Sequence, residues 1–363
     1  MTAWYANRPD PAWTCAALSP NATAFHRTLP DYTPTTIVSL PALAAELEVG
    51  HVLVKDESER LGLPAFKALG ASWALYRALQ YRPPGPVTVV AATDGNHGRA
   101  VARFARRLGH RARIVLPDGV SPAAAQAIRD EDADVIVAGG SYDHAVATAV
   151  RLAEESNGVL VQDTSWDGYT DVPGWIVEGY ATLFAELDEQ LEAGGPDLVV
   201  VPVGVGSLLQ AALAHYRTIT RTGLSRRTAV LAAEAQAAAC LAPSLLAGRP
   251  VTVETRTTVM AGLNCGTPSI LAWPYIRDGL DAAVAVSDED DIRAVHDLAA
   301  LGVPAGPCGA AALAAARLAL TGSDRDERRH HLGIDAGSTV VLICTEGVDA
   351  NPLPDNDVSY GRP

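Results

Sequence analysis

The sequence has no closely paired cysteines, no excess of positive charge and no long uninterrupted hydrophobic run. Its 363 residues include only five cysteines, none of them in a C-x-x-C pair: Cys15, Cys240, Cys265, Cys308 and Cys344. An odd and scattered set of this kind disfavours a disulfide framework and a structural zinc site. We therefore expect no bound metal.

Basic residues number 28 against 42 acidic ones, giving a formal net charge of −14. A chain this acidic repels phosphate backbones and anionic lipids, so neither nucleic acid nor membrane is an expected partner. Pro202, two glycines and two polar residues interrupt the most apolar long window, 199–214, which predicts a strand, a turn and a helix. The first residues lack a basic stretch followed by an apolar one, so we expect a cytoplasmic protein.

Apolar, β-branched runs alternate along the chain with segments of helical spacing, and hydrophobic residues make up 48% of the total. The runs predict strands at 87–92, 113–116, 134–138, 159–162, 197–201, 229–233 and 340–344. Helical spacing is clearest over 66–79, 101–108 and 176–187. This order predicts an α/β fold with open, mostly parallel sheets, whose ligands gather at the carboxyl ends of the strands.

Two Pro- and Gly-rich stretches, 81–86 and 193–196, provide the clearest punctuation between these elements. We predict a smaller inserted αβ lobe over 85–170 and a larger lobe formed by 1–84 together with 171–363.

Polar or glycine-rich segments follow four of the predicted strands directly. The stretch VGVGSL at 203–208 opens a helix, so its backbone N–H groups could hold a phosphate; a plain tight turn is the alternative. In AATDGNHGR at 91–99, Asp94, Asn96 and His97 crowd one turn, although helix capping would explain an aspartate there equally well. Asp163 follows the strand at 159–162, and Thr345 follows the strand at 340–344.

Lys67 lies near the predicted start of a helix, directly after Phe66. Most helical lysines are simply solvated. A positive helix end and apolar neighbours, however, favour the neutral amine that a Schiff base with an aldehyde requires.

Taken together, these segments resemble the fold-type II pyridoxal-phosphate enzymes, the tryptophan synthase β superfamily. The similarity runs from about 55 to 351 and includes the lysine-bearing F-K pair at 66–67. ATDGNHGR, QDTSWDGYTDVPGWIVEGYATL and MAGLNCGTPS resemble most of all the diaminopropionate ammonia-lyases. The resemblance implies two αβα lobes with pyridoxal 5'-phosphate in the cleft between them, and a homodimer.

The resemblance also implies a role for each matching position. Lys67 would carry the cofactor as a Schiff base, Asn96 would bind the ring hydroxyl oxygen, and Thr345 would face the pyridine nitrogen. The phosphate would be bound by Gly204, Val205, Gly206, Ser207 and Leu208. The substrate carboxylate would be received by the loop containing Thr93, Asp94, Gly95 and His97.

Asp94 and Asp163 would be the acid–base carboxylates beside Lys67. Serine and threonine dehydratases of this superfamily usually read S-F-K and S-x-G-N, whereas Ala65 and Asp94 occupy those positions here. A carboxylate at 94 suits an ammonium-bearing substrate, and it supplies a second base opposite Lys67. We therefore expect a carbon–nitrogen lyase that eliminates ammonia from D- or L-2,3-diaminopropionate and produces pyruvate.

Three alternatives stay open at this point. Within the superfamily, the chain could be a serine, threonine or hydroxyaspartate dehydratase or a β-replacement enzyme. Outside it, VGVGSL could bind the pyrophosphate of a nucleotide in a Rossmann-type protein, which would leave Lys67 without a role. A protein that binds the cofactor without catalysis, as a carrier or regulator, is the third.

Overall fold

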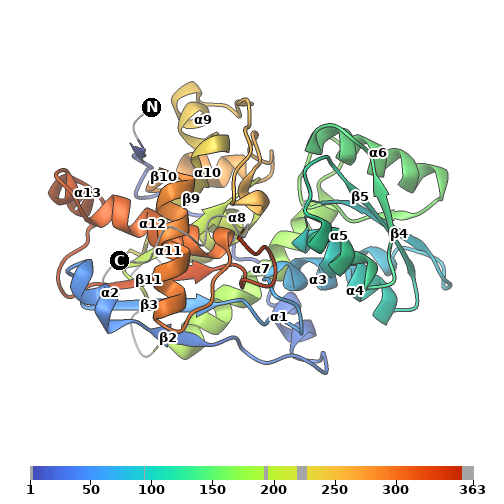
Figure 1. The fold of residues 1–363 in the computed structure, drawn as a ribbon, viewed down its shortest axis with the longest axis horizontal. Helices are drawn as coiled ribbons and strands as arrows, with labels where there is room; N and C mark the ends of the chain where they lie inside the picture. Colours follow the sequence, from blue (N-terminus) through green and yellow to red (C-terminus); the bar gives the residue numbers. More distant parts are fainter. Residues whose placement is uncertain (1–2, 94, 192–194, 219–226, 354–363) are drawn as a thin grey trace. The chain divides into compact units, whose positions relative to one another are not determined.

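The fold is described from a computed structural model, for residues 3–93, 95–191, 195–218 and 227–353. The chain forms two compact units, each made of segments that are discontinuous in sequence (Figure 1). The first comprises Met1–Ser19, Pro34–Glu59 and Leu183–Pro363, and the second comprises Pro20–Thr33 and Arg60–Thr182. The segment predicted to form the smaller lobe, 85–170, lies entirely within the second unit.

The first unit is built on a seven-stranded sheet whose inner strands are all parallel. Short antiparallel strands close its two edges. In spatial order the strands are β1 (Trp4–Ala6), β10 (Ala282–Val286), β9 (Ala229–Ala235), β8 (Leu198–Val203), β11 (Thr339–Cys344), β3 (His51–Asp56) and β2 (Ile37–Ser39).

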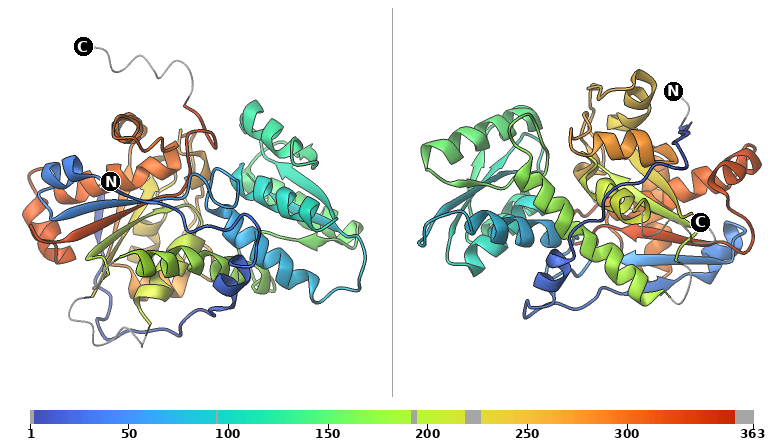
Figure 2. Two further views of the ribbon diagram at one scale, coloured as in Figure 1. Left: turned by 90° about the horizontal axis from the view of Figure 1, so that it is seen from below. Right: turned by 180° about the vertical axis from the view of Figure 1, so that it is seen from behind.

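Helices cover both faces of this sheet (Figure 2). They are α2 (Pro41–Glu46), the C-terminal part of α7 (Asp171–Gln190), α8 (Ser207–Tyr216), α9 (Leu241–Ala247), α10 (Trp273–Gly279), α11 (Asp288–Ala300), α12 (Pro307–Leu320) and α13 (Arg325–Leu332). Two short 3₁₀ turns, η2 (Gln236–Ala238) and η3 (Ala261–Leu263), join them.

The core of the first unit depends on α12, whose sequence PCGAAALAAARLAL is buried along nearly its whole length. A helix that is apolar on all sides belongs inside a protein, and its alanines allow a close approach to the strands. It packs with Val54, Val200 and Leu342 in one hydrophobic cluster. Successive strand residues point to opposite faces, so Val199 and Val341 face the helices of the other side.

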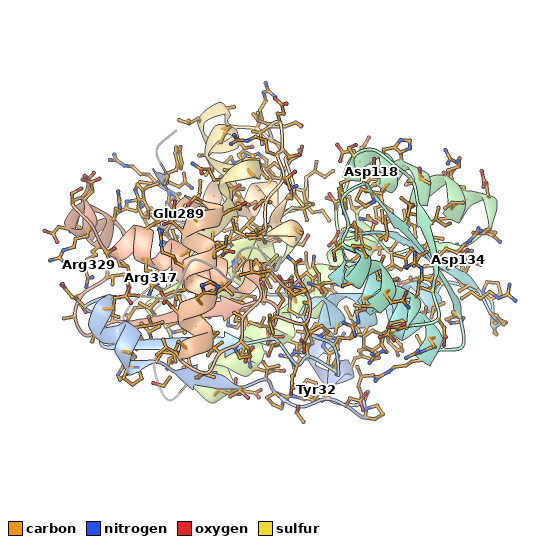
Figure 3. All side chains as sticks on the ribbon, viewed as in Figure 1. Tyr32, Asp118, Asp134, Glu289, Arg317 and Arg329 are labelled. Carbon is orange, nitrogen blue, oxygen red and sulfur yellow. The ribbon has the colours of Figure 1, made fainter. Side chains whose placement is uncertain are left out.

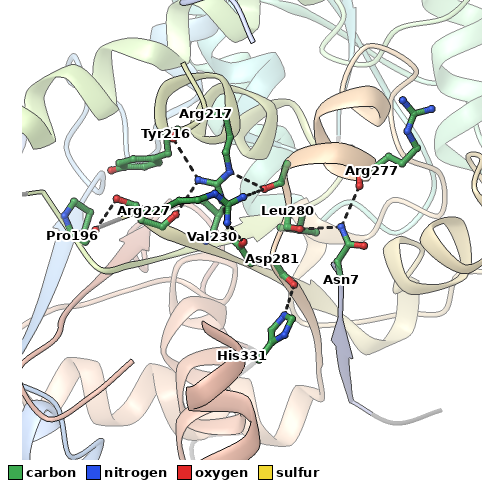
Figure 4. Close-up of polar contacts among 12 residues, drawn as sticks. Asn7, Pro196, Tyr216, Arg217, Arg227, Val230, Arg277, Leu280, Asp281 and His331 are labelled. Atoms are coloured by element: carbon green, nitrogen blue, oxygen red, sulfur yellow. Dashed lines mark hydrogen bonds and ion pairs between the residues drawn. The ribbon is translucent and has the colours of Figure 1, made fainter. Parts of the chain in front are cut away.

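A buried charge network stabilises the amino ends of β9 and β10 (Figure 4). Arg217 donates to Asp281 Oδ2 at 2.6 Å and to the carbonyls of Thr228 and Gly279, both at 2.9 Å. The backbone N–H of Val230 donates to the same carboxylate oxygen at 2.7 Å. Burial lowers the pKa of Arg217 to about 10, and Asp281 offsets part of that effect. This network lies opposite the carboxyl ends of the strands, so we assign it to stability.

Ion pairs at the surface of the first unit link helices that are distant in sequence. Arg317 of α12 reaches Glu46 at 2.7 Å and Asp297 at 2.6 Å (Figure 3). Exposed pairs of this kind contribute little to stability. None of the described helices combines the length and the apolar character that crossing a bilayer requires.

The second unit contains a wholly parallel four-stranded sheet. Its strands, in spatial order, are β6 (Asp134–Val137), β5 (Arg111–Leu116), β4 (Thr88–Ala92) and β7 (Val159–Leu160). One face packs on α6 (Tyr142–Glu155) through Val90, Ala92 and Val115. The remaining helices are α1 (Asn21–His26), α3 (Lys67–Leu79), α4 (Asn96–Arg107), α5 (Pro122–Arg129) and the first part of α7.

The prediction of alternating strands and helices is confirmed, because each of the seven predicted runs contains a strand. Sequence reasoning missed four strands: β1, β2, β3 and β10. Alanine-rich β10 (AAVAV) carries a weak strand signal. In β3, the polar pair Lys55 and Asp56 obscured the pattern.

Candidate active site

Lys67 is the first residue of α3, so its side chain starts at the positive end of a helix. The amine lies 5.2 Å from the centre of the Phe66 ring and 6.0 Å from that of Tyr180. Its side chain is 20% exposed. Lys67 is therefore a partly accessible amine beside two aromatic rings, at the helix start that the sequence predicted.

Asp163 is the ion-pair partner of Lys67. Its Oδ2 lies 2.6 Å from Lys67 Nζ, although 96 positions separate the two residues. Burial alone would raise the pKa of Asp163, but the charges of Lys67 and His97 and the hydrogen bonds from Lys67 and Tyr142 outweigh it. They hold the pKa of this carboxyl well below its usual range, so Asp163 is an anion at neutral pH. Asp163 therefore lies beside Lys67, the place that the resemblance implied for it, while its acid–base role stays a prediction.

The position of Lys67 is set by a close crossing of α3 over α7. A Cβ on Gly70 would lie 2.6 Å from Tyr180 Cε1, and one on Gly179 would lie 2.5 Å from the carbonyl oxygen of Leu69. His26 also holds this helix in place, with Nε2 3.0 Å from the Leu69 carbonyl of α3 and Nδ1 2.8 Å from Thr182 Oγ1 of α7. The crossing leaves α3 little freedom to move, which pre-organises the amine.

The loop between β4 and α4 carries the predicted substrate-binding residues. Thr93 is buried, and its Oγ1 accepts from the N–H groups of Gly95 and Gly98, both at 3.0 Å. Gly95, at φ +155°, leads directly into α4, which begins at Asn96. Asp94, the predicted second base, lies outside the described residues.

His97 lies in the first turn of α4 and is buried. Its Nε2 is 2.8 Å from the carbonyl oxygen of Val161, which can only accept, so that nitrogen carries the hydrogen. Burial is the main cause that lowers the pKa of His97, and the ring is neutral at pH 7. Its other nitrogen, Nδ1, is a buried acceptor without a hydrogen-bond partner among the described residues.

The predicted phosphate turn joins β8 to α8 in the first unit. Gly206 is the residue before the helix and has φ +98°, a conformation that favours glycine. Gly206 has no side chain to cap the helix, and Val205, Ser207 and Leu208 are buried. A Cβ on Gly204 would lie 2.8 Å from the carbonyl oxygen of Gly262, so the 260–269 segment packs directly against the turn. This geometry suits an anion held by backbone N–H groups.

Thr345 follows β11, the strand next to β8, so the two strands end at the same edge of the sheet. Thr345 is 3% exposed, and its Oγ1 has no hydrogen-bond partner among the described residues. A buried hydroxyl normally has a partner, so this oxygen is suited to a ligand atom. Glu346 beside it accepts from the N–H of Cys308 at 3.1 Å.

Sequence reasoning missed Glu234, which pairs with Val203 in the sheet register at the start of the same turn. Burial raises the pKa of Glu234 to about 7, although the N–H groups of Leu241 and Cys240 donate to Oε1 at 3.0 and 2.8 Å. Glu234 is the second-to-last residue of a strand of small apolar residues, AVLAAEA, and no neighbouring motif marks it.

The whole chain contains only two lysines, Lys55 and Lys67. Lys55 is fully buried in β3, where Nζ donates to Glu186, Gln190 and the carbonyl of Thr35, each at 2.8 Å. These bonds use all three donors of its ammonium group, so Lys55 is a structural cation. Lys67 is therefore the lysine suited to hold an aldehyde.

The described residues fit pyridoxal phosphate. The group needs an amine for its aldehyde, an anion site for its phosphate and a partner for its ring nitrogen. Lys67 provides the amine. The turn at 204–208 provides the anion site, and the hydroxyl of Thr345, unpartnered among the described residues, is suited to the ring nitrogen. No set of three or more His, Cys, Asp or Glu side chains in the described part of the chain could hold a metal ion.

Comparisons with known proteins give a consistent result. The family model described as "Pyridoxal-phosphate dependent enzyme" matches residues 28–346. A diaminopropionate ammonia-lyase of Salmonella typhimurium is 32% identical, covering 93% of this chain and 91% of the relative. An L-threonine ammonia-lyase of Geobacter sulfurreducens is 29% identical over 66% of this chain and 58% of its own length.

Solved structures agree with the sequence comparisons. The crystal structure of diaminopropionate ammonia lyase from Escherichia coli with an aminoacrylate-PLP azomethine reaction intermediate superposes with a TM-score of 0.86 at 30% identity, covering 95% of this chain and 94% of that one. Maize serine racemase shares the fold, with a TM-score of 0.76 at 23% identity over 94% of this chain and 95% of that one. From the family match over most of its length and the geometry of both units, the chain belongs to the pyridoxal-phosphate-dependent enzymes of fold type II, in the branch that contains the diaminopropionate ammonia-lyases.

Proposed function

We propose that this protein is a pyridoxal-phosphate-dependent carbon–nitrogen lyase acting on 2,3-diaminopropionate, in the D or L form or both. With one water, the substrate yields pyruvate and two molecules of ammonia. The observation that carries the proposal is the pair of Lys67 and Asp163 at 2.6 Å. A carboxylate held anionic beside the cofactor lysine is suited to an ammonium leaving group, which a serine or threonine substrate lacks.

Each residue has a distinct role in this proposal. Pyridoxal phosphate, when bound, withdraws electrons from the α-carbon of the substrate. Lys67 Nζ holds the cofactor and takes the α-proton of one enantiomer from one face of the substrate. Asp94 takes the α-proton of the other enantiomer from the opposite face. Asp163 holds the β-ammonium as it leaves. The loop 93–97 receives the substrate carboxylate, and Asn96 binds the ring hydroxyl.

The hydroxyl of Thr345 would meet the ring nitrogen without protonating it, because an alcohol is a very weak acid. Through this contact Thr345 would hold the bound ring in its less electron-withdrawing, unprotonated form, which would suit β-elimination. The turn at 204–208 anchors the phosphate. A homodimer and a cytoplasmic location remain predictions.

The test is to supply purified protein with each enantiomer of 2,3-diaminopropionate and to measure pyruvate and ammonia together. Serine, threonine and hydroxyaspartate serve as comparison substrates, because a dehydratase would prefer one of them. Lys67→Ala should abolish product formation and the cofactor absorbance. Borohydride reduction followed by peptide mapping should place the pyridoxyl group on the peptide containing Lys67 and not on that containing Lys55; the reverse result would disprove the assignment.

A further inference from the structure

The two carboxylate oxygens of Asp163 have different partners. Oδ2 accepts from Lys67 Nζ, whereas Oδ1 accepts from the phenol hydroxyl of Tyr142 at 3.3 Å and, at a longer 3.5 Å, from Nε2 of the neighbouring Gln162. Tyr142 is the first residue of α6, 21 positions before Asp163. Nothing in the local sequence SYDH distinguishes it from an ordinary residue at a helix start.

The direction of the hydrogen bond from Tyr142 is set by its neighbour Gln162. The Oε1 atom of Gln162 accepts from the N–H of Ala92 at 2.9 Å, which fixes the orientation of the amide. Its Nε2 then donates to the Ala92 carbonyl at 3.1 Å and to the Tyr142 hydroxyl at 2.7 Å. Because the phenol oxygen accepts from Gln162, its own hydrogen is available to Asp163. The end of β4, Gln162, Tyr142 and Asp163 thus form one chain of donors that ends on the carboxylate.

We propose that Tyr142 is a positioning residue for Asp163, which it keeps oriented and negatively charged when Lys67 gives up its own charge. The inference rests on the proposed function, because only that function requires Lys67 to be neutral while Asp163 stays anionic. The amine that holds a carbonyl or accepts an α-proton is uncharged beforehand. At that moment the attraction of Lys67 for the Asp163 carboxylate is lost, whereas the burial that opposes a negative charge remains.

Several titratable groups face Asp163 from the surrounding elements. Burial raises the pKa of Asp163. Lys67 lowers this pKa most, followed by His97 and Tyr142. His97 is neutral at pH 7, so it supplies little positive charge there. The phenols of Tyr169 and Tyr180 stay protonated, because burial raises the pKa of each. Among the described residues, the groups that face Asp163 are Lys67, His97, Tyr142, Tyr169 and Tyr180. When Lys67 is neutral, the hydrogen bond from Tyr142 makes a larger share of the stabilisation of the Asp163 carboxylate.

The direct test removes Lys67 and measures the titration of Asp163 without cofactor or catalysis. Carbon-13-labelled aspartate carboxyls are titrated by NMR in the full-length Lys67→Ala protein and in the Lys67→Ala/Tyr142→Phe double variant. Loss of one resonance in an Asp163→Asn version identifies the signal. A hydrogen bond to a charged acceptor accounts for about one pH unit, so Asp163 should titrate about one unit higher in the double variant. Titration at the same pH in both proteins would overturn the proposal.

Turnover supplies a second readout with a matched control. Tyr142→Phe should move the acid limb of the pH profile of kcat/KM upward by about one unit and change cofactor affinity less than about twofold. Tyr169→Phe is the control, because among the described residues the Tyr169 hydroxyl bonds only backbone groups, the Gln162 N–H at 3.0 Å and the Leu160 carbonyl at 2.9 Å. It should lower stability and leave the acid limb in place.

The two ideas fail in different ways. A wild-type protein that releases no ammonia from any substrate would disprove the proposed function, while the NMR titration would still measure the effect of Tyr142 on Asp163. An active enzyme whose acid limb moves equally in the Tyr142→Phe and Tyr169→Phe proteins would refute the positioning role alone.

Discussion

Replacement of Thr345 by valine separates a residue that serves the fold from one that serves the cofactor. Both side chains are β-branched and have almost the same shape, so the substitution exchanges the hydroxyl for a methyl group with little change in packing. Thr345 Oγ1 is buried and unpartnered among the described residues. Thr345→Val removes this buried unpartnered hydroxyl without breaking a hydrogen bond among the described residues. In the cofactor-free protein the substitution should therefore stabilise the fold by about 1–3 kcal/mol.

The cofactor-bound protein should respond in the opposite direction. A neutral hydrogen bond to the ring nitrogen contributes about 0.5–1.5 kcal/mol, so pyridoxal phosphate should bind roughly two- to tenfold more weakly to Thr345→Val. Denaturant unfolding of the cofactor-free protein measures the first effect. Cofactor titration followed by absorbance measures the second.

Thr182→Val is the matched control for this experiment. Thr182 is equally buried, but its hydroxyl is 2.8 Å from His26 Nδ1. The same substitution there leaves the imidazole nitrogen without its partner and should destabilise the fold by about 1–3 kcal/mol. If Thr345→Val destabilises the cofactor-free protein as much as Thr182→Val does, or leaves cofactor affinity unchanged, Thr345 does not face the ring nitrogen.

Two further predictions concern the glycines and the buried acid near the proposed site. Gly98→Ala should lower the free energy of unfolding by about 1–3 kcal/mol, since the new Cβ would lie 2.3 Å from Thr93 Cγ2 and 2.6 Å from Ile114 Cγ2. Gly174→Ala is the control, because Gly174 lies in another helix and has open space around the position of a new Cβ; this variant should be neutral or stabilised by up to about 1 kcal/mol. Equal denaturation curves for the two variants would contradict this packing argument. The pKa of Glu234 rises from 4.5 to about 7, so its neutral form is favoured by folding and the stability it contributes is lost as pH rises through about 7. Between about pH 5 and pH 8, the free energy of unfolding should fall by about 3 kcal/mol, and Glu234→Gln should abolish this fall. An unchanged pH dependence in that variant would assign the effect to another group.

Much of the architecture could be predicted because parallel strands covered on both faces are short, apolar and β-branched. The runs at 197–201 and 340–344 show this pattern, and the strands β8 and β11 lie there. The same logic located the functional segments, since polar residues directly after buried strands stand out against apolar surroundings. Local signals failed where the strand residue was a buried charge, as with Lys55, or where alanine replaced valine, as in β10.

The sequence by itself determined the alternation of strands and helices, the glycine turn after β8 and the lysine that begins α3, because each depends on neighbours within a few residues. Only the tertiary structure decided which distant side chains meet. Lys55 is balanced by Glu186, 131 positions away, which leaves Lys67 as the lysine for chemistry. Tyr142 reaches Asp163 because α6 packs on the sheet in which β7, the strand before Asp163, is an edge strand. These pairings follow from strand order and helix crossing, which bring together residues whose spacing along the chain carries no signal.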